Sequence, residues 1–278
     1  MERLTAQRGF TSLCLRMVGS LNTSQAVAMK ESLRLTGQLD YPHSEIKMVL
    51  DSSMQLYRLA ACAKEPETVE WIETHVRPGD VFYDIGANVG AYALVAHAVA
   101  GGDCTVYAFE PSFSTFAALS ENVRLNRCDG KVVPLHVALS AETKVLTFNY
   151  SQVVPGAASH GLDQPIGEDL KPFTPTFTQP ILSYKLDELI EQFSLLPPCH
   201  IKLDVDGSEF DVLKGAEKTL SNKGLRSILV EIDEAELRGE TIRANLESKG
   251  FEVKTRHQRR GSASLANYIF ERRNQVNS

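Results

Sequence analysis

The chain has 278 residues, a formal net charge of −6, and ordinary shares of apolar (43%) and charged (23%) residues. This length fits one large domain, or one domain with an N-terminal extension, and the negative charge argues against a nucleic-acid-binding surface. The five cysteines are scattered and never stand in Cys-x-x-Cys spacing, which argues against a zinc site or a disulfide framework and favours a reducing compartment. No apolar run resembles a signal peptide or a membrane span, so we expect a cytoplasmic protein that does not bind a membrane.

Residues 1–64 carry the weakest signals. Apolar residues recur loosely at helical spacing over residues 1–40, which predicts helical pieces that pack on the main domain or on a second subunit. The oligomeric state is therefore open, and a homodimer is one interpretation. Two short strands, Ile46–Leu50 and Leu56–Ala60, are expected next. We separate an N-terminal helical and strand extension, residues 1–64, from one domain over residues 65–278.

The clearest local pattern is a buried strand that reaches Asp84, turns on Gly86 and opens directly into a helix over Ala91–Ala100. Such a turn at the start of an α/β unit marks the place where a cofactor lies across the carboxyl ends of parallel strands. A dinucleotide fingerprint would need Gly-x-Gly-x-x-Gly, but the middle place holds Asn88 and the next glycine is Gly90. Asp84 at the mouth of the turn would also repel a pyrophosphate.

A second strand, Val106–Phe109, ends at Glu110, about where a Rossmann-like unit places a carboxylate on ribose hydroxyls. S-adenosylmethionine carries a sulfonium and an ammonium group but no phosphate, so two acids suit it better than they suit NAD. Either acid alone could merely cap the next helix, but the combination favours the cofactor. We expect S-adenosylmethionine to bind at Asp84, Gly86, Ala87, Asn88, Gly90, Glu110 and Pro111.

Two further positions could contact this cofactor. Thr68 lies in the first turn of a helix over Pro66–Val76 and could face the amino-acid end of the cofactor, although residues there more often serve only the helix start. The third strand, Lys131–Val137, runs into Ala138, whose backbone would lie beside an adenine ring.

After a strand over Thr143–Tyr150, the composition shifts to prolines, glycines and threonines in residues 151–180. A structureless stretch of this length inside a domain is usually a lid, a binding loop or disordered. His160 lies within it. A loop histidine is most often solvated and idle, but on a closing lid it could contact substrate.

The strand Cys199–Val205 carries polar residues at every second place: Lys202, Asp204 and then Asp206. Charged groups inside a central parallel strand are costly unless they are paired or used. Lys202 could simply pair with a carboxylate, or hold a substrate oxygen, and Asp206 could cap the next helix together with Ser208. Asp204 is expected to point into the crevice beside the cofactor turn.

A metal site is a weaker alternative at this edge of the sheet. Four carboxylates would suit magnesium or calcium, but their short spacing does not aim them at one point. We therefore expect no metal, and magnesium if any. The carboxylates are Asp204, Asp206, Glu209 and Glu231.

Strands and helices alternate from Val81 to Ile232, which predicts an α/β fold with a doubly wound, Rossmann-like, mostly parallel sheet. Two last strands are expected to close it as an antiparallel pair. The later strands are Ile181–Lys185, Cys199–Val205, Leu225–Ile232, Phe251–Lys254 and Leu265–Glu271.

These motifs resemble those of FkbM-family methyltransferases over about residues 64–235. The resemblance implies a class I methyltransferase fold with an antiparallel last strand, and O-methylation of a small-molecule hydroxyl, on a secondary metabolite or a sugar, from S-adenosylmethionine. It assigns the cofactor turn, the ribose acid and a Lys-x-Asp-x-(Glu/Asp)-Gly-x-Glu run. The matching residues are Asp84, Gly86, Asn88, Gly90, Glu110, Lys202, Asp204, Asp206 and Glu209.

The hypothesis is an in-line displacement in which a substrate hydroxyl attacks the sulfonium methyl, with proximity supplying most of the acceleration. Asp204 is the first candidate base and His160 the second, for a smaller factor. Two rivals stay open. Asn88 and Asp84 count against an NAD-dependent oxidoreductase, and the intact acids count against a non-catalytic cofactor-binding protein.

Overall fold

The computed structural model describes residues 16–167 and 171–273, which fall into two compact units. The first unit ends at Thr36 and contains helix α2 (Thr23–Ser32). Asn22 caps this helix in a capping box with Gln25, and none of its residues is buried. The helical spacing thus predicted a helix correctly here, while residues 1–15 lie outside the described part.

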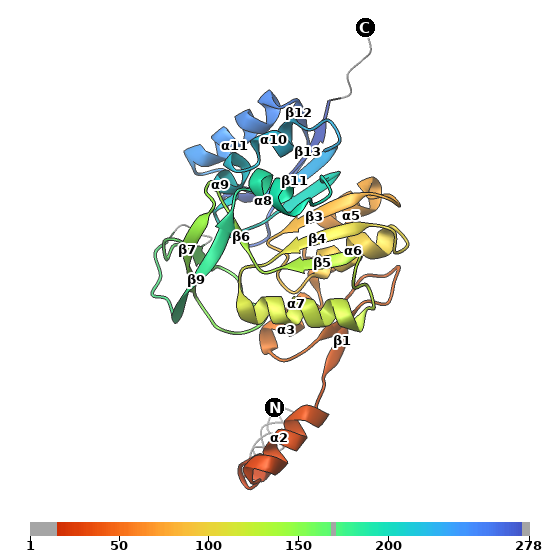
Figure 1. Cartoon of the computed structure of the whole chain (residues 1–278), viewed down its shortest axis with the longest axis vertical. Coiled ribbons are helices and arrows are strands. Elements are labelled where there is room, and N and C mark those ends of the chain that lie inside the picture. The colour runs from red at the N-terminus through yellow and green to blue at the C-terminus, as the bar shows by residue number, and fades with distance from the viewer. Residues whose placement is uncertain (1–15, 168–170, 274–278) are drawn as a thin grey trace. The chain divides into compact units, whose positions relative to one another are not determined.

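The second unit begins at Gly37, earlier in the chain than the domain boundary suggested by the sequence. Its centre is a seven-stranded sheet in the order β12-β13-β11-β10-β3-β4-β5 (Figure 1). All neighbours from β11 to β5 pair in parallel, whereas β13 pairs antiparallel with both β11 and β12. This confirms the predicted fold class. The strands are β3 (Val81–Ile85), β4 (Thr105–Phe109), β5 (Val132–Leu135), β10 (His200–Leu203), β11 (Ser227–Asp233), β12 (Phe251–Gln258) and β13 (Leu265–Arg272).

Helices cover both faces of this sheet because the central strands are apolar on both sides. In β3, Phe82 packs with one cluster of side chains, while its neighbours Val81 and Tyr83 pack with the other. The first face carries α5 (Pro66–His75), α6 (Ala91–Val99) and α7 (Phe113–Leu125); the second carries α8 (Leu186–Phe193), α9 (Glu209–Lys214), α10 (Glu217–Ser221) and α11 (Leu237–Ser248).

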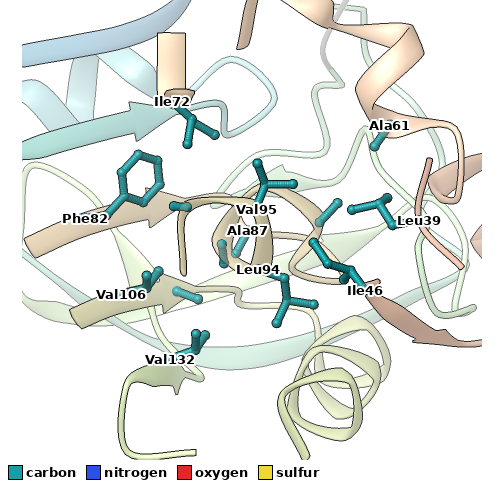
Figure 2. Close-up of a cluster of buried hydrophobic side chains, with 14 of the residues drawn as sticks. Leu39, Ile46, Ala61, Ile72, Phe82, Ala87, Leu94, Val95, Val106 and Val132 are labelled. Atoms are coloured by element: carbon teal, nitrogen blue, oxygen red, sulfur yellow. The ribbon is translucent and has the colours of Figure 1, made fainter. Parts of the chain in front are cut away.

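In the core on the first face, side chains of α6, of the sheet and of the segment after Gly37 pack together. Leu94 and Val95 of α6 lie between Phe82 on the sheet and Ile46 on the far side (Figure 2). Leu94 is 2% exposed and Val95 is fully buried. Truncating such a side chain to alanine costs about 2–5 kcal/mol, so this packing fixes the turn that precedes α6.

Of the two strands predicted between residues 46 and 60, the structure contains only the first. The first predicted strand is confirmed as β2 (Lys47–Val49); its partner, β1 (Thr36–Gln38), was not predicted. The second predicted strand is wrong, because the chain forms α3 (Ser53–Arg58) and α4 (Ala61–Lys64) there. Ser52 and Gln55 make a capping box that starts α3, and this local signal outweighs the apolar spacing.

Residues 138–184 build a separate four-stranded sheet in the order β6-β9-β7-β8. The expectation that residues 151–180 are structureless is partly wrong, because β8 and the first half of β9 lie within them. Both strands pair with β7, whose backbone groups need partners once the chain leaves the main sheet. The strands are β6 (Ala138–Leu139), β7 (Lys144–Tyr150), β8 (Gly161–Leu162) and β9 (Phe177–Tyr184).

Within the described residues, no helix combines the length and the apolar character that crossing a membrane requires. The four cysteines in that part of the chain are free thiols, while Cys14 lies outside it.

Candidate active site

A cavity of about 100 Å³ lies at the carboxyl ends of the parallel strands. Gly86 after β3, Glu110 after β4 and Asp204 after β10 line it, together with residues of the small sheet and of the loop before β8. A second, smaller cavity shares Gly86 and Asp204 and reaches Lys202. Of the predicted site residues, these two cavities bring together Gly86, Ala87, Asn88, Glu110, Pro111, Ala138, His160, Lys202 and Asp204.

Three predicted site residues do not reach either cavity: Asp84, Gly90 and Thr68. Thr68 is fully buried in α5, and no side-chain hydrogen bond caps the start of that helix, so neither its predicted ligand contact nor a capping role has support here. Gly90 has φ +86°, and a Cβ there would lie 2.4 Å from Leu119 Cδ1, so this glycine allows α6 to pack on α7.

The glycine at the turn is required by the approach of two strand ends. Gly86 has φ +80°, and a Cβ on it would lie 1.8 Å from the carbonyl oxygen of Asp204. The backbone N–H of Asp204 donates to Ile85 O at 3.0 Å, which continues the pairing of β3 with β10. The turn at Gly86 therefore brings the residues that follow β3 into direct contact with Asp204, which follows β10.

Lys202 is the centre of a buried ionic group. It is 1% exposed, and its Nζ lies 3.2 Å from Asp204 Oδ2 and 3.6 Å from Asp84 Oδ1. Burial alone would lower the pKa of Lys202, but the two carboxylates outweigh it and raise the pKa. Lys202 therefore stays charged and pairs with carboxylates, which was one of the two predicted roles.

Asp84 faces Lys202 rather than the cavity. Its side chain is fully buried, and burial raises its pKa above the ordinary value although Lys202 opposes this. The expectation that Asp84 meets a cationic cofactor directly has no support in this geometry. Asp84 instead holds Lys202, which in turn contacts Asp204.

Asp204 is the partner that faces the cavity, with about a third of its side chain exposed. Burial would raise its pKa, but Lys202 and Lys64 outweigh this and hold the pKa below the usual range. Asp204 is therefore an ionised carboxylate at the cavity wall, fixed in direction by a buried lysine.

Glu110 accepts one backbone hydrogen bond on each carboxylate oxygen. Oε2 accepts from the N–H of Asn88 at 2.9 Å, and Oε1 accepts from the N–H of Ser112 at 2.8 Å. Burial raises the pKa of Glu110 to about 7, against the effect of these bonds. Each oxygen keeps a second lone pair, so Glu110 can accept further bonds from two hydroxyl groups.

His160 is 8% exposed and lines the same cavity. Its Nδ1 accepts from the backbone N–H of Ser151 at 3.3 Å. Burial lowers the pKa of His160 to about 4, so the ring is neutral near pH 7 and carries its one proton on Nε2. A protonated Nε2 cannot accept a proton, which argues against the predicted role of His160 as a base.

Asp206 is a site residue whose importance the sequence did not reveal. It does not cap α9 with Ser208, because no side-chain bond caps that helix, and Glu209 instead accepts from Val205 N and Gly207 N. Asp206 lines the cavity, and burial raises its pKa to about 7. Its position in the variable acidic place of the motif was the available signal.

A loop before β8 covers the cavity and is tied down along its length. The ties come from three regions that are distant in sequence: α3 and its cap, the cofactor turn, and the end of β10. They join Ser52 Oγ to Pro155 O (2.7 Å), Arg58 Nη2 to Gly156 O (2.8 Å), Asn88 Nδ2 to Ala157 O (2.8 Å) and Ser159 N to Asp206 Oδ2 (2.7 Å). Arg58 was missed because residues 56–60 were predicted as a strand, and Ser52 because it was assigned only to the turn before that strand.

Among residues 16–167 and 171–273, no group of three or more His, Cys, Asp or Glu side chains could hold a metal ion. Of the four candidate carboxylates, Glu231 pairs with Arg259 at 3.0 Å and Glu209 accepts backbone N–H groups. These two carboxylates are therefore occupied by their own neighbours, while Asp204 and Asp206 line the cavity.

Residues 84–253 match the model of the methyltransferase FkbM domain. The hexuronic acid methyltransferase AglP of Haloferax volcanii is 28% identical over 186 residues, covering 67% of this chain and 70% of that protein. The 31-O-demethyl-FK506 methyltransferase FkbM of Streptomyces tacrolimicus is 44% identical over 73 residues, 26% of this chain and 28% of that protein. A crystal structure of methyltransferase FkbM from Methylobacillus flagellatus aligns with 79% of this chain and 56% of its own, at 17% identity and a TM-score of 0.48.

Proposed function

The chain belongs to the FkbM methyltransferase domain family and is a methyltransferase; on that premise we propose that it transfers the methyl group of S-adenosylmethionine to a hydroxyl of a small molecule. The observation that carries the proposal is the set of carboxylates at one cavity: Glu110, Asp204 and Asp206 all line it. The same wall also carries Arg58, Lys64 and Arg259, so the support lies in where these carboxylates stand, at the carboxyl ends of neighbouring strands, and not in the net charge of the cavity.

The residues present fit this cofactor. Glu110 keeps lone pairs for ribose hydroxyls, and the ionised Asp204 offers a counter-charge to a sulfonium or an ammonium group. Pro111, Ala138 and Leu139 supply an apolar wall for the base. When bound, S-adenosylmethionine supplies a methyl group activated by its positively charged sulfur.

The residues of the chain would orient the reacting groups and remove one proton from the attacking hydroxyl. Lys202 fixes Asp204 in direction, and the tied loop excludes water from the reacting hydroxyl. Asp204 stays the first candidate for the group that accepts the hydroxyl proton. Asp206 is a second, because a base is most effective when its pKa lies near the working pH.

The acceptor class rests on the relatives. One is named for a hexuronic acid and the other for 31-O-demethyl-FK506, a name that places the methyl group on an oxygen. Both names fit a hydroxylated small molecule.

The covering loop is proposed to open when ligands enter. The cavity holds about 100 Å³, whereas sites for ligands of nucleoside size usually measure about 300–1,000 Å³. The hydrogen bonds to Pro155, Gly156 and Ala157 are the contacts that opening would break.

Calorimetric titration with S-adenosylmethionine tests the proposal. We expect micromolar binding to the wild type, and about tenfold weaker binding to Glu110→Gln, because the amide NH2 that replaces one oxygen can accept neither a ribose hydroxyl nor the backbone N–H that this oxygen bonds. Glu217→Gln is the matched control, since Glu217 pairs with Lys249 away from the cavity. Absence of binding to the wild type, or equal binding to both variants, would contradict the cofactor assignment.

A further inference from the structure

His160 holds a polar atom whose partner is missing from the described part of the chain. Its Nε2 is buried and makes no hydrogen bond there, although the side chain lines the cavity. Buried polar groups are almost always paired, because an unpaired one loses its bonds to water without replacement. An unpaired atom at a cavity wall therefore points to a ligand that completes it.

The neighbours of the ring determine what this atom can do. The backbone N–H of Ser151 can only donate, and it is directed at His160 Nδ1. Ser151 Oγ also lies 3.2 Å from Nδ1, but its proton is used in a bond to Ala158 O at 2.9 Å. Nδ1 is therefore the acceptor, and Nε2 carries the proton as a donor.

The side chains around His160 form a wall that suits a flat, apolar ring of a ligand. Its imidazole lies 5.4 Å from the ring of Phe148 and 5.3 Å from that of Tyr150, measured between ring centroids. Phe148 lines the cavity together with Leu139 and Leu162. Arg58 and Asp206 lie near this histidine and line the same cavity, but the side chains packed on its ring offer apolar contact, and Nε2 is the donor among them, whereas Glu110 offers acceptors.

We propose that His160 recognises the adenine ring of the cofactor by donating from Nε2 to one of its ring nitrogens. The inference rests on the proposed function, which it makes more specific. Adenine is planar and presents N1, N3 and N7 as acceptors in its plane, so a single fixed N–H between apolar side chains complements it. The ribose hydroxyls, which donate, belong with Glu110. His160 is thus a residue that determines cofactor specificity, not a base.

Binding of S-adenosylhomocysteine and its 1-deaza, 3-deaza and 7-deaza analogues, measured by calorimetry, tests this assignment without turnover. Each analogue replaces one acceptor nitrogen by C–H. For the wild type we expect one of the three to bind about tenfold more weakly than the parent compound, because the His160 bond is lost. His160→Phe keeps the ring shape and removes the donor. It should bind the parent compound about tenfold more weakly and show no further loss with that same analogue.

The outcomes separate this inference from the proposed function. Equal binding of all three analogues to the wild type overturns the assignment, and this arm does not depend on a folded variant. An unchanged affinity of His160→Phe for the parent compound overturns it as well. If the wild type binds none of the compounds, the proposed function fails together with the inference.

Discussion

The two ends of the parallel strands bury similar groups in different ways. At the amino ends, His200 is 1% exposed and burial lowers its pKa to about 4, as for His160. Its Nδ1 bonds to Ser227 Oγ at 2.7 Å, and its Nε2 lies 3.0 Å from Arg226 and 3.3 Å from Asp80. Both nitrogens of His200 are thus used within the protein, whereas His160 uses one.

The carboxylates show the same contrast. Burial would raise the pKa of Asp80, but Arg226 and the backbone N–H of Arg77 outweigh it and lower the pKa. At the carboxyl ends, burial raises the pKa of both Glu110 and Asp206 to about 7. A buried cluster of Ser, His and Asp does not by itself indicate a functional site. Ser227 is fully buried, and the polar groups of its cluster with His200 and Asp80 are paired within the protein. Incomplete pairing beside a cavity is the better indicator.

The largest expected effect on stability comes from removing the charge of Lys202, which pairs with Asp84 and Asp204 at the carboxyl ends of the strands. Lys202→Met leaves the fully buried Asp84 and the partly exposed Asp204 without their partner, which should cost about 3–5 kcal/mol of unfolding free energy at pH 8. The loss should be smaller at pH 5, because the buried carboxylates can then take up protons. Urea unfolding at both pH values measures it, with the exposed Lys218→Met as control. Equal losses for the two variants would contradict the account.

The second effect compares the two buried histidines. His200→Phe breaks bonds to Ser227 and Arg226, and should lower stability by about 2 kcal/mol while leaving cofactor affinity unchanged. His160→Phe should cost less than half as much, because it removes an unpaired donor at the same time. Chemical denaturation and calorimetry on both variants test the pair. A weaker cofactor affinity in His200→Phe would break the distinction between the two ends.

The third effect is a fall in stability on the alkaline side. Glu110 and Glu209 both have their pKa raised to about 7, from an ordinary value of 4.5. The folded state then holds protons that the unfolded chain has released, so this stabilisation is present at low pH and is lost as pH rises through about 7. Between pH 6.5 and 8 we expect a loss on the order of 1 kcal/mol per group, or about 2–4 °C in Tm.

Calorimetric Tm values of the wild type, Glu110→Gln and Glu209→Gln over this range test the origin of the fall. Each variant should flatten the decline, because its side chain no longer titrates. Below about pH 6.5 the decline should become shallower, since the buried neutral His160 and His200 resist protonation that the unfolded chain accepts and so partly offset the carboxylates. A Tm that rises from pH 6.5 to 8 would be inconsistent with the raised carboxylate pKa values.

The smallest effect concerns the loop over the cavity. Arg58→Met removes two hydrogen bonds to Gly156 O, from Nε at 3.0 Å and from Nη2 at 2.8 Å. Hydrogen exchange of residues 151–162 should become several-fold faster, while global stability changes by less than about 1 kcal/mol. Amides of β4 provide the internal control. Unchanged exchange in the loop would show that Arg58 does not hold it.

The main sheet could be predicted because each strand is a short apolar run between turn residues. The same signal located Asp204 beside the cofactor turn, and period two placed Lys202 on the same face. The polar residues at the strand ends follow their strands directly in the sequence. They could therefore be identified from the sequence, and the family motifs contain them.

What the sequence did not show depends on contacts between distant segments. Arg58 reaches Gly156 across almost a hundred positions, and nothing local to α3 indicates that contact. Asp84 looked like a ligand residue because it ends a strand at the turn, yet only the position of Lys202 on the neighbouring strand decides where it points. The partner of His160 Nδ1 likewise had to be seen before its proton could be assigned.

The most direct test of the account is hydrogen exchange with and without S-adenosylhomocysteine, read along the whole chain. We predict protection at residues 86–89, 109–112 and 155–162, the segments that hold residues lining the two cavities at the carboxyl ends. No protection is expected at His200, Arg226 or Ser227, at the opposite ends of the same strands. Protection at the amino ends, or bound ligand without protection at the carboxyl ends, would contradict the assignment of the active site.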